Sequence, residues 1–190
     1  MENMKKIIAF IDGLNRRIGH VVAWCAIYMV LVQFTVVILR YVFAMSFIAV
    51  VETVWYSHGL LFMLGAGYTL LHDGHVRVDV IYGDASDRTR AIVDLLGSVF
   101  FLLPVAFMIF WFSRGYIINS WKVFEVSAES GGLPLVFAYK TVIWAFAVLI
   151  GLQGIAMALR AIVFLSGGAE RYFASPAAAE KAASATEIRP

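Results

Sequence analysis

The stretch that decides the fold is residues 135–159, LVFAYKTVIWAFAVLIGLQGIAMAL, in which 25 residues carry a single charge, that of Lys140. At about 1.5 Å per residue, a helix of this length crosses a hydrocarbon core of roughly 30 Å with some tilt. Three further apolar segments of comparable length lie at 21–39, 47–71 and 91–112. Each of the four predicts a transmembrane helix.

Composition agrees with this reading of the four segments. Of the 190 residues, 62% are hydrophobic and 15% are charged, whereas a soluble domain is about 45–50% apolar and roughly 25% charged. Only Glu52, Asp94 and Lys140 place a charge inside a span. Alternation at period two is absent, which argues against a transmembrane β-barrel. We therefore predict an all-α integral membrane protein, with one four-helix domain at 1–168 and a disordered cytoplasmic tail at 169–190 that is rich in Ala and Ser.

The distribution of basic residues predicts the orientation. Counted near the span ends, nine Lys and Arg residues fall on one side of the membrane and three on the other. Because cytoplasmic loops carry the excess of positive charge, both termini are expected to face the cytoplasm. The nine are Lys5, Lys6, Arg16, Arg17, Arg77, Arg88, Arg90, Arg160 and Arg171, and the three are Arg40, Arg114 and Lys122.

Two segments outside the spans have helical periodicity. In residues 5–18, KKIIAFIDGLNRRI, apolar side chains recur on one face at positions 7, 11, 14 and 18. This pattern predicts an amphipathic helix on the cytoplasmic leaflet, with a downward extension of the first span as the alternative. In the outer loop 113–134, apolar side chains at 117, 121 and 124 predict a short helix at the outer interface.

Charged groups inside membrane spans are costly and are therefore functional candidates. Glu52 and Lys140 each lie five residues inside the outer end of a span, at a depth of roughly 7.5 Å. Opposite charges at one depth indicate a pair, within the chain or with a partner, although both side chains could instead reach the interface. His58 lies near mid-depth and has no second histidine at its level, which disfavours a haem anchor with two histidine ligands.

No motif for an enzyme is recognisable. Hydrolase, zinc-protease and ATP-binding signatures are missing, no basic run suggests nucleic acid, and no span has the interrupted centre of a transporter's own substrate site. Small residues at helix-contact spacing instead predict close packing of helices. They are Gly59 and Gly67 in the second span, and Ala147, Gly151, Gly154 and Ala158 in the fourth.

Three motifs, in their order along the four spans, resemble one family. They are RYVF at 40–43 followed by Glu52, HDGHVRVDVIY at 72–82, and GGLP at 131–134 followed by Lys140. Together they resemble the small permease subunit, of the DctQ type, in tripartite ATP-independent periplasmic (TRAP) transporters. The resemblance covers roughly residues 5–165.

The resemblance implies a secondary transporter that is built from three parts and located at the bacterial inner membrane. A periplasmic binding protein captures the substrate, usually an organic acid, and a large multi-span permease subunit holds the substrate and sodium sites. The small subunit scaffolds the large one and helps to dock the binding protein, with no cofactor of its own.

The motifs then acquire expected roles. Arg40, Glu52 and Lys140 are expected to form a polar cluster near the outer face, at the contact with a partner. The cytoplasmic turn motif, expected to anchor the chain at the lipid surface, comprises His72, His75, Arg77 and Asp79. The outer-loop motif comprises Gly131, Gly132, Leu133 and Pro134. The alternative function is a small proton-coupled exporter that works through Glu52 as a homodimer.

Overall fold

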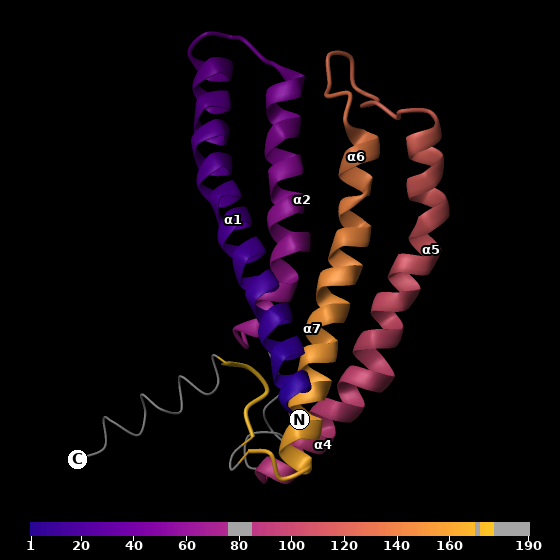
Figure 1. Cartoon of the computed structure of the whole chain (residues 1–190). Coiled ribbons are helices and arrows are strands. Elements are labelled where there is room, and N and C mark those ends of the chain that lie inside the picture. Colours follow the sequence, from indigo (N-terminus) through magenta and orange to yellow (C-terminus); the bar gives the residue numbers. More distant parts are fainter. Residues whose placement is uncertain (76–84, 170–171, 177–190) are drawn as a thin grey trace, which may run out of the picture.

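The computed structural model describes residues 1–75, 85–169 and 172–176, and its helices form an elongated bundle (Figure 1). Four helical stretches are long and apolar enough to cross a membrane, and the described residues contain no strand. The predicted all-α fold with four transmembrane helices is confirmed. The stretches are α1 (Glu2–Tyr41), α2 (Ile48–Leu71), α4 (Asp87–Gly97) continued through the π-helical turn η1 (Ser98–Leu102) into α5 (Leu103–Lys122), and α6 (Val136–Lys140) continued into α7 (Val142–Leu165).

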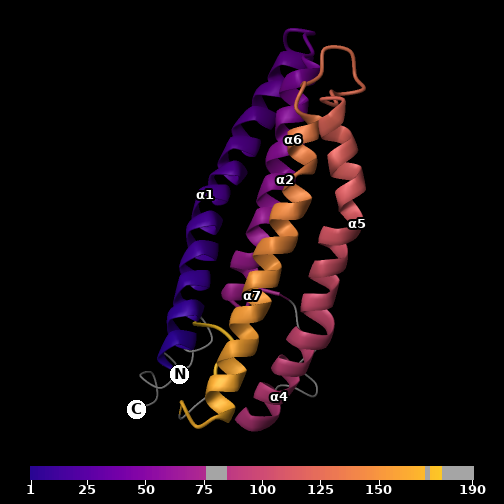
Figure 2. The ribbon, with the colours of Figure 1, turned by 45° about the vertical axis from the view of Figure 1, so that its right-hand side comes forward.

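Helix α7 is the centre of the bundle. It contacts α1, α2, α4 and α5, and α1 and α2 lie side by side on one flank while α5 lies on the other (Figures 1 and 2). We call the end that carries the 42–47 turn and the 123–135 loop the loop end, and the opposite end, where α1 begins, the terminal end. Much of the buried surface of α7 is alanine, which lets neighbouring helices approach closely; its buried alanines are Ala147, Ala156, Ala158 and Ala161.

The predicted separate interfacial helix at 5–18 is wrong. Helix α1 runs without interruption for 40 residues, which is about 60 Å or twice the thickness of a hydrocarbon core. Its first turns bury Ile11, Asp12 and Asn15 inside the protein. The amphipathic pattern therefore arises because this stretch extends the first span and packs on other helices, which was the alternative interpretation.

The predicted short outer helix is likewise the last part of a span, since α5 continues to Lys122. Pro104 lies at the start of α5, directly after the π-helical turn. In that turn the Leu103 N–H reaches Ser98 O, one residue further back than in an α-helix. The wider turn gives the proline ring room where it would otherwise meet the preceding carbonyl groups.

The small residues predicted to mediate packing lie at close approaches between helices. A Cβ added to Gly67 of α2 would lie 2.2 Å from Asn15 Oδ1 of α1, and one added to Gly59 would lie 1.8 Å from the Tyr139 hydroxyl of α6. In α7, a Cβ at Gly154 would lie 2.8 Å from a methyl of Leu102. Gly151 has the looser contact, 3.6 Å from the Ala106 Cβ, and Ala147 and Ala158 are buried.

The tail at 169–190 was predicted to be disordered, and for residues 172–176 this is wrong. Tyr172 and Ala174 are buried against Ala91 of α4 and Ala161 of α7. The Tyr172 hydroxyl donates to Asp94 Oδ2 at 2.8 Å, which joins the segment after α7 to α4. Residues 170–171 and 177–190 lie outside the described part of the chain.

Candidate functional site

Glu52, in the second turn of α2, is 4% exposed and accepts hydrogen bonds from the 123–135 loop. Its Oε2 accepts a hydrogen bond from the Leu133 N–H at 2.6 Å, and its Oε1 accepts one from the Ser127 hydroxyl. A buried carboxylate is tolerated when such donors replace water. Through these two hydrogen bonds, Glu52 holds the 123–135 loop against α2.

The GGLP motif supplies the backbone shape that this contact requires. Gly131 has a φ of +78°, a left-handed conformation that favours glycine. A Cβ on Gly132 would lie 2.4 Å from the Ser127 hydroxyl and 2.8 Å from Glu52 Oε1. Leu133 then uses both backbone groups, because its carbonyl accepts from the Ser127 N–H at 3.1 Å. Pro134 is exposed and precedes α6.

Lys140, at the end of α6, forms an ion pair with Glu125 of the loop. Its ammonium group also lies 3.9 Å from the centre of the Tyr116 ring on α5. The hydrogen bond from Lys140 holds the pKa of the Glu125 carboxyl below its ordinary value of 4.5. A second charged contact thus joins the loop to α6.

The predicted cluster of Arg40, Glu52 and Lys140 is not what the structure contains. Among the described residues, Glu52 and Lys140 bond to different parts of the loop, and neither pairs with the other. Arg40 is exposed in the last turn of α1, where its guanidinium lies 3.5 Å from the Ser46 hydroxyl. The three residues share the loop end, but the partner of Lys140 is Glu125, a loop residue that sequence reasoning did not single out.

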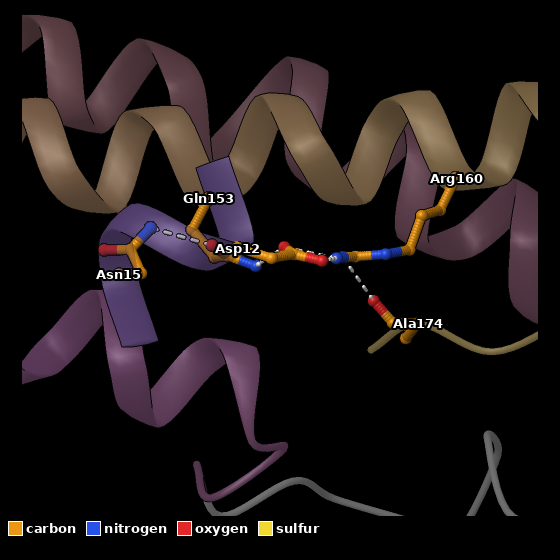
Figure 3. A network of polar contacts seen from close by, with 5 residues as sticks. All are labelled: Asp12, Asn15, Gln153, Arg160 and Ala174. Atoms are coloured by element: carbon orange, nitrogen blue, oxygen red, sulfur yellow. Dashed lines mark hydrogen bonds and ion pairs between the residues drawn. The ribbon is translucent and has the colours of Figure 1, made fainter. Parts of the chain in front are cut away.

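A second polar network lies at the terminal end, inside the bundle (Figure 3). Asp12 of α1 pairs with Arg160 of α7, and Arg160 also donates to the Ala174 carbonyl at 3.1 Å. Gln153 connects this pair to Asn15, accepting from the Asn15 amide at 2.8 Å and donating to Asp12 at 3.3 Å. One row of bonds therefore joins α1, α7 and the segment after α7.

Sequence reasoning missed this network, although a signal for it existed. Gln153 is the most polar side chain in the inner half of its span, and Arg160 follows seven residues later on the same helical face. Asp12 and Asn15, three residues apart, also share a face. Polar side chains that line up in this way on two helices are candidates for a contact between them.

Part of the cytoplasmic turn motif can be placed. His72 follows α2, with its Nδ1 3.0 Å from the Tyr68 carbonyl and its ring 4.0 Å from the Tyr68 ring centre. His75 is exposed. Arg77 and Asp79 lie outside the described residues, so the anchoring role expected for this motif stays a prediction.

A cavity of about 420 Å³ opens between α2, α5, α6 and the start of α7 near the loop end. His58 lines it together with Tyr116, Tyr139 and Lys140. The His58 ring lies 6.2 Å from that of Phe62. The remaining wall is mostly aliphatic and aromatic, as expected for a surface that faces lipid or a neighbouring helix.

Both ends of the helix bundle are therefore held by polar contacts between its segments. A comparison with protein families then identifies the family of the chain. The family described as "Tripartite ATP-independent periplasmic transporters, DctQ component" matches residues 29–168. Searches of curated proteins and of solved structures gave no match. The matched region contains all four spans in whole or in part, so the resemblance drawn from the three motifs is confirmed. This chain belongs to the DctQ family, and it is the small membrane component of a TRAP transporter rather than an enzyme.

Proposed function

We propose that this chain is the rigid membrane scaffold of a sodium-coupled importer of organic acids. In this role it holds a large permease subunit in the inner membrane and offers its loop end to the periplasmic binding protein. Both termini face the cytoplasm, as the distribution of basic residues predicts. Substrate and sodium are bound by the large subunit and not by this chain.

One observation carries the proposal: the charged groups at the loop end are used to fix the shape of the 123–135 loop. Glu52 binds two groups of the loop and Lys140 binds Glu125. A loop fastened at two points to α2 and α6 presents a preorganised surface, which lowers the entropic cost of binding a partner. Its exposed hydrophobic side chains, Val123, Phe124 and Val126, supply contact area.

The outer surfaces of α1 and α5 also support a scaffolding function. Large apolar side chains are exposed along α1 and α5, among them Trp24, Phe34 and Phe107. Contiguous exposed apolar surface in a membrane helix faces lipid or another transmembrane helix. A subunit of this shape has ample surface for a larger partner.

If the chain were instead a proton-coupled exporter, the Glu52 carboxylate would have to exchange protons with water. At 4% exposure and with two hydrogen bonds from the loop, that carboxylate would have to release the loop in every cycle. A structural role requires no such movement. The scaffold is therefore the better supported of the two functions.

The test compares Glu52→Gln with Glu129→Gln, a matched change at an exposed acid of the same loop. Each variant is produced with the large subunit and reconstituted with the binding protein. Glu52→Gln should weaken binding of the binding protein and slow uptake, because it loosens the loop, while Glu129→Gln should match the unchanged protein. Equal uptake by both variants would contradict the proposal, and proton-driven efflux by this chain alone would favour the exporter.

A further inference from the structure

A second groove, of about 540 Å³, lies between α1, α2 and α7 toward the terminal end. Its walls are aliphatic, and one charged side chain, that of Arg17, stands among its lining residues. The apolar walls are formed chiefly by Val21, Val22, Leu64, Val148 and Leu149. A groove with one cation and otherwise aliphatic walls suits an elongated amphipathic molecule.

Arg17 is free to bind such a molecule. Its side chain is exposed, and within the part of the chain that the structure describes no ion pair or hydrogen bond involves its guanidinium. Other basic groups are engaged, since Lys6 pairs with Glu2 and Arg160 with Asp12. A guanidinium without an internal partner can form two parallel hydrogen bonds with a phosphate.

The position of Arg17 along the bundle matches the level of lipid headgroups. On the neighbouring helix α2, Gly67 faces Asn15 and Tyr68 faces Gly19, so Arg17 lies level with the last turn of α2. Helix α2 has 24 residues, or about 36 Å, and its ends therefore reach the two membrane interfaces. Val21 lies one helical turn further into the bilayer, so the groove leads from the headgroup level toward the bilayer centre.

We propose that this groove binds an anionic phospholipid of the leaflet at the terminal end. The phosphate group is held by Arg17, and one acyl chain lies along Val21, Val22 and Val148. A transmembrane helix with its side chains is about 10–12 Å across and would lie over the groove rather than in it, whereas a single acyl chain is narrow enough to enter. The lipid also places its charge at one end only, as the groove does, and a basic residue near the membrane surface attracts anionic lipid.

The experiment measures lipid retained by the full chain in detergent, using native mass spectrometry with added phosphatidylglycerol or phosphatidylcholine. Arg17→Gln removes the phosphate contact, and Val148→Phe narrows the groove. Arg16→Gln is the matched control, because Arg16 is equally basic, exposed and adjacent but does not line the groove.

Phosphatidylglycerol should be retained by the unchanged chain and by Arg16→Gln, and about fivefold less by Arg17→Gln. Val148→Phe should also reduce retention. Equal loss in the two arginine variants, or equal retention of both lipids, would overturn the proposal. The same measurement is made on the complex with the large subunit, which should also retain phosphatidylglycerol. A complex without the lipid would contradict the proposal and would indicate that the large subunit covers the groove.

Discussion

Replacement of Asp12 by Asn tests whether the terminal-end network stabilises the bundle. Asp12 pairs with Arg160, and the two side chains are 13% and 12% exposed. The substitution preserves the size of the side chain and its ability to accept a hydrogen bond from Gln153. It removes the negative charge beside the guanidinium of Arg160 and one of the two side-chain oxygens that accept from it. The guanidinium then stays inside the bundle with only neutral acceptors, the remaining amide oxygen at position 12 and the Ala174 carbonyl.

The magnitude follows from the burial of the pair. Removing one member of a buried ion pair costs about 3–5 kcal/mol, because the other charge stays buried without compensation. Since Arg160 keeps hydrogen bonds to neutral acceptors, we expect the lower value, about 3 kcal/mol, or roughly a hundredfold in the unfolding equilibrium. Arg160→Met should cost a similar amount, and the double variant should cost less than the sum by about 2 kcal/mol or more.

The assay is unfolding of the purified chain in mixed micelles with increasing sodium dodecyl sulfate, followed by tryptophan fluorescence. Lys6→Met is the control, because it breaks the ion pair of Lys6 with Glu2, whose side chains are 71% and 81% exposed. That change should cost less than about 0.5 kcal/mol. If Asp12→Asn is as mild as the control, or if the single effects simply add, the network does not brace the bundle and the reasoning fails.

Two further substitutions probe close packing and the loop end. Gly67→Ala should destabilise the chain by about 2 kcal/mol, because the added Cβ would lie 2.2 Å from Asn15 Oδ1. In the same unfolding assay Gly65→Ala should be neutral or stabilising, because a Cβ there meets no atom within 4 Å. Equal effects of the two substitutions would contradict the contact between α1 and α2 at Gly67. For Glu125, whose pKa is lowered by Lys140, the stabilising contribution is present above the ordinary pKa of 4.5 and is lost as the pH falls through the lowered value. Lys140→Met should return the Glu125 pKa toward 4.5 in a carboxyl titration followed by NMR, and an unchanged titration would exclude the pair.

The spans could be read from the sequence because lipid imposes a simple requirement on composition. A run such as 135–159 must be helical and apolar wherever its neighbours lie. The structure at the ends of the helices was harder to predict from the sequence. An apolar stripe on residues 5–18 looks the same whether it faces lipid headgroups or another helix, and only the packing of Ile11 and Asn15 inside the bundle decides between them.

The sequence also could not predict which charged side chains form ion pairs, because these pairs depend on tertiary structure. Glu52 and Lys140 lie at similar depth, but which anion reaches Lys140 depends on the path of the 123–135 loop. That path depends on the left-handed turn at Gly131 and the close approach at Gly132. Asp12 and Arg160 are separated by 148 positions in sequence, so their contact follows from how α1 and α7 pack rather than from any local pattern.

The central claim is that this chain scaffolds a larger permease subunit. It is tested most directly by the mass of the complex that the chain forms with that subunit. The tagged chain is produced together with the large permease subunit, extracted in mild detergent, and analysed by native mass spectrometry. We expect a stoichiometric complex of one small and one large subunit. A homodimer of this chain that leaves the large subunit unbound would contradict the claim.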